Sequence, residues 1–147
     1  MRILIGAVGK VKERGARELV DDYLKRISRY ARVEEIELKD GDEAEVAARF
    51  AKAIPNDRSV VVALEVDGKA WSSHRLADFV SEHENVGTQN VVFLIGGSYG
   101  LPKATSAAAD VLLSLSAMTL PHRLARILLA EQIYRAFSIL RGEPYSH

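Results

Sequence analysis

The chain has 147 residues, of which 48% are hydrophobic, and its 20 basic side chains balance its 20 acidic ones. This length suits a single domain with a substantial core, and apolar residues along the whole chain argue against disorder. The lack of cysteine excludes a disulfide framework, thiolate metal sites and a cysteine nucleophile. No run approaches the roughly 20 apolar residues of a membrane helix, and the N-terminus does not resemble a signal peptide. We therefore expect a cytoplasmic protein without membrane association.

The zero formal charge hides an uneven distribution. Residues 1–32 carry nine Lys or Arg against four acids, residues 33–100 carry six against thirteen, and residues 101–147 carry five against three. Two basic ends thus flank an acidic middle. If the two ends meet in space, they form a basic face suited to phosphate. The alternative interpretation is that these charges are ordinary solvated side chains on helix surfaces.

Short runs rich in Val and Ile alternate with segments of helical periodicity. We expect strands at 2–8, 33–39, 59–66, 90–97 and 110–116, and helices at 13–30, 42–54, 72–84 and 121–141. The runs 59–66 and 90–97 are apolar on both faces, as in a parallel sheet covered by helices. The alternation predicts one α/β domain over residues 1–147, with three layers and a mostly parallel sheet.

Three of these strands end in loops of unusual composition. They are LEVDGKAW (64–71), LIGGSYGLP (94–102) and SLSAMTLPH (114–122). Ligands of parallel sheets bind beyond the carboxyl ends of the strands, so the three loops are candidates for a binding site. The glycines of the second loop form neither the dinucleotide fingerprint nor a Walker loop, and they suit a structural turn as well as a ligand loop.

The third loop offers successive peptide units between a buried strand and a buried helix. Its backbone groups can read an adenine edge, while Leu115, Met118 and Leu120 supply an apolar wall. Thr119 also suits the helix N-cap. His122, at the start of the helix, either faces a substrate or caps the turn.

A serine hydrolase is an alternative interpretation of the glycine loop. Residues 96–100 match the nucleophile-elbow pattern G-x-S-x-G around Ser98, and Asp110 and then His122 or His147 follow in the order of a triad. However, Asp110 opens a strand, at the end of the sheet opposite Ser98. The four histidines show no metal-ligand spacing, so we expect no metal site.

The C-terminal third resembles a known enzyme family. The stretch VVFLIGGSYGL (91–101), followed by LSLSAMTLPHRLARILLAEQIYRAFSILRGEPY (113–145), is similar to the bacterial ribosomal RNA large-subunit pseudouridine N3-methyltransferases of the SPOUT superfamily. RILIGAVGK (2–10) and LEVDGKAWSS (64–73) extend the similarity along the chain. The resemblance implies a SPOUT fold with a deep C-terminal trefoil knot, a homodimer, and S-adenosylmethionine (AdoMet) as cofactor. It also implies methylation of N3 of a pseudouridine in large-subunit rRNA on the assembled ribosome.

The resemblance also assigns residues. Its cofactor site maps onto Leu64, Gly96, Leu115, Ser116, Ala117, Met118, Thr119 and Leu120. Candidates for a base or cation acting on N3 are His122, Arg135, Tyr145 and His147. Arg135 follows His122 by 13 residues on one helix, about 20 Å along the axis, so one chain cannot easily bring both to one site.

The tail departs from the family pattern. Family members usually continue Pro-Tyr with His and a basic residue, whereas Ser146 and then His147 follow Tyr145 here. This departure weakens the assignment of the tail but leaves the cofactor site unaffected. It keeps a third hypothesis open, that of a non-catalytic, ribosome-binding relative.

Overall fold

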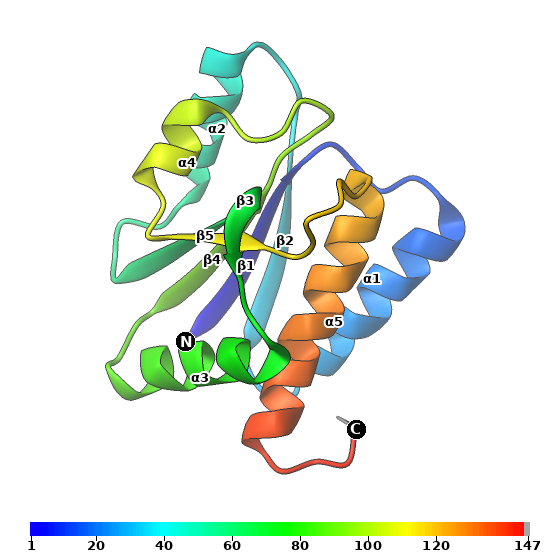
Figure 1. Cartoon of the computed structure of the whole chain (residues 1–147), viewed down its shortest axis with the longest axis vertical. Coiled ribbons are helices and arrows are strands. Elements are labelled where there is room, and N and C mark those ends of the chain that lie inside the picture. The colour runs from blue at the N-terminus through cyan, green and yellow to red at the C-terminus, as the bar shows by residue number, and fades with distance from the viewer. Residues whose placement is uncertain (146–147) are drawn as a thin grey trace.

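The computed structural model, which describes residues 1–145, is built around one five-stranded sheet (Figure 1). In chain order its elements are β1 (Arg2–Val8), α1 (Arg14–Ile27), β2 (Arg32–Leu38), α2 (Glu43–Ala53), β3 (Ser59–Ala70), α3 (Ser73–Asn85), β4 (Asn90–Ile95), α4 (Lys103–Ala108), β5 (Val111–Ser114) and α5 (His122–Leu140). The strand order is β2-β1-β4-β3-β5, and every neighbouring pair is parallel. The predicted parallel α/β fold is confirmed.

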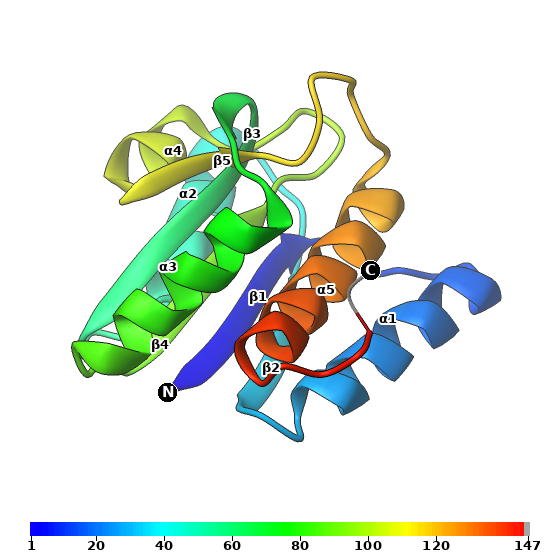
Figure 2. The ribbon, with the colours of Figure 1, turned by 60° about the horizontal axis from the view of Figure 1, so that its bottom comes forward.

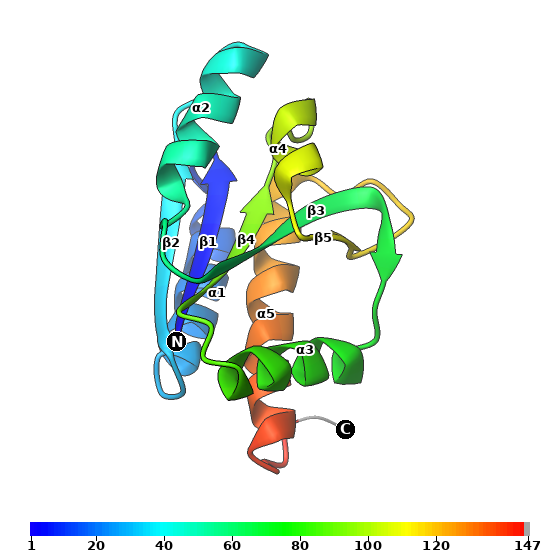
Figure 3. The ribbon, with the colours of Figure 1, turned by 90° about the vertical axis from the view of Figure 1, so that its left-hand side faces the viewer.

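Helices cover both faces of the sheet. On one face α5 packs between α1 and α3 (Figure 2), while α2 and α4 lie together on the other (Figure 3). Successive strand residues point to opposite faces, so Ile3 and Ile5 join the core beneath α5 and Leu4 joins the core beneath α2. Three layers with two apolar cores result, as the sequence predicts.

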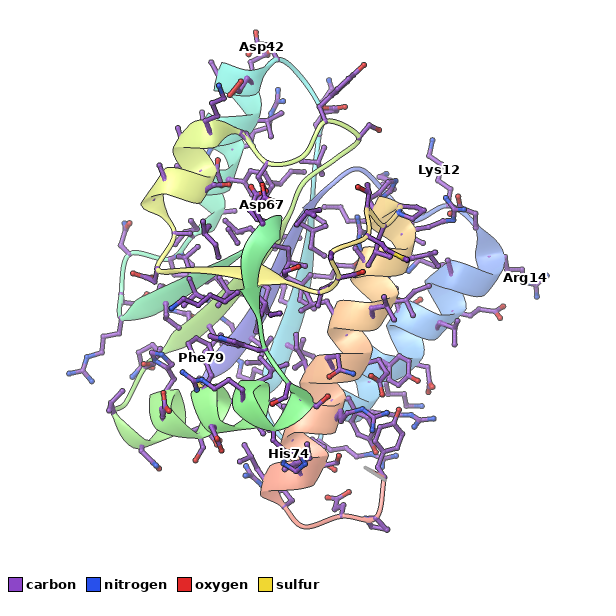
Figure 4. The ribbon with its side chains drawn as sticks, in the orientation of Figure 1. Lys12, Arg14, Asp42, Asp67, His74 and Phe79 are labelled. Atoms are coloured by element: carbon purple, nitrogen blue, oxygen red, sulfur yellow. The ribbon has the colours of Figure 1, made fainter. Side chains whose placement is uncertain are left out.

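Strand β3 is longer than predicted. It continues to Ala70, and its pairing with β5 shifts between Leu64 and Lys69. At this irregularity a Cβ on Gly68 would lie 2.7 Å from the backbone of Leu112, so only glycine allows the two strands to approach there. The extension carries Asp67 out over β5 (Figure 4).

Helix α4 is not predicted by the sequence, whereas α5 starts within one residue of its predicted start at Pro121. Helix α4 has six residues, too few to show a helical period. Helix α5 takes Pro121 as its N-cap, so the predicted capping role of Thr119 is wrong. From β5 at the sheet edge the chain loops outward and then enters α5, on the face of the sheet that α1 and α3 also cover (Figure 2), which is consistent with the expected knot.

Only part of the apolar surface of α5 is buried. Leu129, Ile133 and Phe137 are fully buried, whereas Leu124 and Leu128 are 42% and 43% exposed. Within residues 1–145, no helix is long and apolar enough to cross a membrane.

Candidate functional site

A cavity of about 610 Å³ lies where residues 64–66 of β3 and the loops after β4 and β5 meet the start of α5. This volume is within the range of small-ligand sites. The residues of the predicted cofactor site that line it are Leu64, Gly96, Leu115, Ser116, Met118, Thr119 and Leu120. Ala117 belongs to the same loop but does not line the cavity. Segment 64–71 is largely part of β3 and not the predicted loop, but it converges with the other two predicted segments at one cavity, as expected for a parallel sheet.

The glycine loop forms one wall of the cavity. Gly100 has a φ of +80°, and its N–H donates to the carbonyl oxygen of Gly97 at 3.0 Å. A Cβ on Gly96 would lie 2.3 Å from the carbonyl carbon of Gly100 and 2.5 Å from the nitrogen of Leu101. Glycine at position 96 is thus required by the loop's own backbone, and a larger residue would disrupt the wall before it met a ligand.

Local hydrogen bonds hold the loop after β5. The Ser114 hydroxyl donates to the carbonyl oxygen of Ser116 at 3.0 Å, and the Ser116 hydroxyl accepts from the N–H of Met118 at 2.9 Å. Short polar side chains that bond to nearby backbone favour such turns. Met118 is left 78% exposed at the cavity rim. The two serines therefore hold the turn between β5 and α5, and Met118 contributes to the rim of the cavity.

His122 is the first residue of α5, and it lines the cavity. Its Nδ1 atom is buried and has no hydrogen-bond partner among the described residues. A buried polar atom without a partner is costly and rare. The capping role considered for His122 is not seen, because Pro121 is the N-cap and makes no side-chain cap bond. The orphaned nitrogen instead suits contact with a ligand or substrate.

Two of the four predicted catalytic residues lie together in a second cluster, outside the cavity. The Tyr145 hydroxyl donates to Glu131 Oε2 at 2.7 Å, and Arg135 Nη2 donates to the same oxygen at 2.7 Å. The Arg135 guanidinium lies 4.9 Å from the centre of the Tyr145 ring. His147 lies outside the described residues.

At neutral pH this second cluster combines the Arg135 cation, the Glu131 carboxylate and the protonated Tyr145 phenol. Burial, together with hydrogen bonds to Tyr23 and Glu131, raises the pKa of Tyr145, so its phenol stays protonated. The hydrogen bond to Glu131 raises the pKa of Arg135. Burial alone would raise the pKa of Glu131, but hydrogen bonds from Arg135 and Tyr145 outweigh it and lower that pKa. The sequence analysis missed Glu131, although its spacing of four residues from Arg135 is typical of helical ion pairs.

The hydrolase hypothesis lacks its triad. Ser98 and His122 line the same cavity, but no hydrogen bond joins them in the described structure. The Asp110 carboxylate accepts the N–H of Val61 at 2.8 Å, at the start of β5. Within residues 1–145, no group of three or more His, Asp or Glu side chains is placed to hold a metal ion.

Comparison with known families supports the methyltransferase fold and not the hydrolase. Residues 1–147 match a family described as "Predicted SPOUT methyltransferase". The chain belongs to this SPOUT methyltransferase family. It is 49% identical to the ribosomal RNA large subunit methyltransferase H of Sorangium cellulosum (strain So ce56) over 147 residues, which are 100% of both chains. It is 45% identical to the protein of that name from Carboxydothermus hydrogenoformans, with 99% of each chain covered.

Solved structures share the fold of this SPOUT methyltransferase. A probable methylase family protein from Haemophilus influenzae Rd KW20 aligns with a TM-score of 0.57 at 12% identity, covering 99% of this chain and 70% of that one. A probable methyltransferase from Bordetella pertussis Tohama I aligns with a TM-score of 0.56 at 11% identity, covering 92% and 95%. At such low identity these likenesses show the fold alone, which agrees with the expected SPOUT architecture.

Proposed function

We propose that this SPOUT methyltransferase binds AdoMet in the cavity and methylates N3 of a pseudouridine in large-subunit rRNA on the assembled ribosome. The observation that carries the proposal is the convergence of residues 64–66 of β3 and the loops after β4 and β5 on one cavity. Full-length identity of 49% to a ribosomal RNA large subunit methyltransferase supports the rRNA substrate. The buried, unpartnered Nδ1 of His122 in the cavity wall supports a ligand there.

The chain's own residues account for the chemistry required. AdoMet supplies a methyl group activated by its sulfonium. The nucleophile, N3 of pseudouridine, is an imide nitrogen that has to lose a proton, and a positioned base or a nearby cation assists that loss. His122 offers a base in the cavity wall, and Arg135 offers a permanent cation. Placement of N3 against the methyl carbon is the remaining contribution of the protein.

The distance between these two groups supports a homodimer. His122 and Arg135 are 13 residues apart on α5, about 20 Å along the axis. Apolar side chains that a second copy can cover are exposed nearby: Leu19 on α1 is 47% exposed, and Leu124 and Leu128 on α5 are 42% and 43% exposed. In the proposed dimer, Arg135 of one chain acts beside the cavity of the other.

A basic loop beside the cavity suits the phosphates of rRNA. Lys10 and Lys12 are exposed between β1 and α1, and Arg14 is exposed at the start of α1 (Figure 4 labels the last two). Arg123, which lines the cavity, lies 3.9 Å from Glu13, the residue before α1. The basic residues of the N-terminal segment therefore lie near the basic residue of the cavity wall. Lys and Arg side chains bind nucleic acid mainly through its phosphates.

Two measurements test the proposal. Calorimetry with AdoMet, without added metal, should show binding on the order of micromolar. Labelled AdoMet should then transfer its methyl group to whole ribosomes more readily than to free rRNA, and mapping should place the label on N3 of a pseudouridine. Absence of AdoMet binding would contradict the cofactor site. Ribosome binding without methyl transfer would instead favour the non-catalytic hypothesis.

A further inference from the structure

Glu65 brings a carboxylate to the cavity from β3, next to Leu64. The two side chains leave the strand on opposite faces, as strand geometry requires. Leu64 packs against the core beneath α5, whereas Glu65 meets α4, where the Ser106 hydroxyl donates to its Oε1 at 2.5 Å. The cavity lies at the point where the pairing of β3 with β5 becomes irregular, and both residues line it.

The carboxylate of Glu65 keeps unused acceptor capacity. Among the described residues that line the cavity, Glu65 is the only acid, and no described Lys, Arg or His lies within ion-pair distance of it. Its Oε2 accepts no hydrogen bond from the described residues. An ionised carboxylate has about four lone-pair sites, so this oxygen can accept hydrogen bonds from a ligand. The group is therefore suited to a ligand that brings hydroxyl or N–H donors.

The existing partner of Glu65 indicates which donors suit it. A hydroxyl already binds one of its oxygens with the short length of an O–H···O⁻ bond. Ser106 thereby orients the carboxylate, leaving the second oxygen for another donor in the cavity. In nucleotide sites of parallel sheets, an acidic side chain after a strand accepts hydrogen bonds from ribose hydroxyls. A nucleoside ligand in this cavity offers such hydroxyls.

We propose that Glu65 is a specificity-determining residue whose carboxylate accepts hydrogen bonds from the ribose hydroxyls of the cofactor. The proposal rests on the proposed function, because it requires an adenosyl ligand in this cavity. Glu65 thus selects ligands that carry the ribose diol, and Ser106 acts as its positioning residue.

Calorimetry on the purified full-length protein tests the proposal through affinities alone. The ligands are AdoMet, its demethylated product S-adenosylhomocysteine, and the analogue of that product lacking both ribose hydroxyls. Glu65→Gln should weaken binding of the product about tenfold or more, since hydrogen bonds to charged groups contribute about 1.5–3 kcal/mol. The same substitution should leave the affinity for the analogue almost unchanged. Ser106→Ala should weaken product binding less than Glu65→Gln does.

Asp67→Asn is the matched control. It removes the same charge from the same strand, but Asp67 is exposed and does not line the cavity (Figure 4). Its affinities should match those of the unaltered protein, and a thermal melt checks that each variant is folded. Equal weakening of product and analogue by Glu65→Gln would overturn the assignment. So would a larger loss for AdoMet than for the product, because it would mean that Glu65 responds to the sulfonium charge. Failure of the unaltered protein to bind the product would instead overturn the cofactor site itself.

Discussion

At the residue scale, Arg126 connects the start of α5 to the sheet. Its side chain is fully buried, and it donates to Glu35 at 2.9 Å, to Glu37 at 2.5 Å and to the Gly9 carbonyl oxygen at 3.1 Å. Arg17 of α1 pairs with the same two carboxylates. This network lies one helical turn after His122 and fixes the helix end that lines the cavity.

Arg126→Met should destabilise the protein strongly. The substitution keeps the bulk of the side chain but removes its charge. The carboxylates of Glu35 and Glu37 then have Arg17 as their remaining cation. Breaking a buried ion pair costs about 3–5 kcal/mol. Arg17 should hold the loss near the lower end of that range. Urea denaturation measures the change in the free energy of unfolding. Arg14→Met is the control, because Arg14 forms an exposed ion pair with Glu18. It should change the free energy of unfolding by less than about 1 kcal/mol. Equal losses in the two variants would disprove the role of burial.

At the element scale, the helices differ in how their starts are secured. Helix α2 has a full capping box: the Asp42 carboxylate accepts from the N–H of Glu45 at 2.8 Å, and the Glu45 carboxylate accepts from the N–H of Asp42 at 3.1 Å. Ser72 caps α3 through the N–H of Arg75. Helix α5 begins at Pro121 without a side-chain cap. Its start is instead held by Arg126 and by the loop that forms the cavity.

Loss of the α2 cap should be measurable. Asp42→Ala should lower the free energy of unfolding by about 1 kcal/mol, because it leaves helix N–H groups without an acceptor. Asp42→Ser retains a capping oxygen and should recover most of the loss. Thermal denaturation of the two variants provides the comparison, and equal destabilisation by both would show that the cap bond is unimportant.

At the scale of the whole molecule, two chemically distinct clusters occupy opposite parts of α5. The cavity at its start holds His122, and the cluster near its end holds Arg135 and Tyr145. A dimer that unites them makes each site from two chains, which is possible in a two-fold symmetric assembly.

Mixing two inactive variants tests this arrangement. His122→Ala and Arg135→Ala should each reduce methyl transfer while Arg135→Ala spares AdoMet binding. After the two variants are unfolded and refolded together, activity should return to about a quarter of that of the unaltered protein, because half of the dimers are mixed and each has one intact site. Were both groups to act from the same chain, the mixed dimers would have no intact site and activity would stay absent.

The sequence by itself determined the parallel sheet, its covering helices and the loops that converge. Apolar periodicity and strand-end composition are local properties, and they were enough to predict that segments 64–71, 94–102 and 114–122 lie at one edge of the sheet. The assignment of Leu64, Gly96 and residues 115–120 to the cofactor came from the family resemblance. The short helix α4 was not predicted, because six residues are too few to show a helical period. Only the tertiary structure decided which charged groups meet. Arg126 bonds Glu35 across 91 residues, and Ser106 bonds Glu65 across 41. Such pairs depend on how strands and helices pack, and no pattern within a single element records that packing.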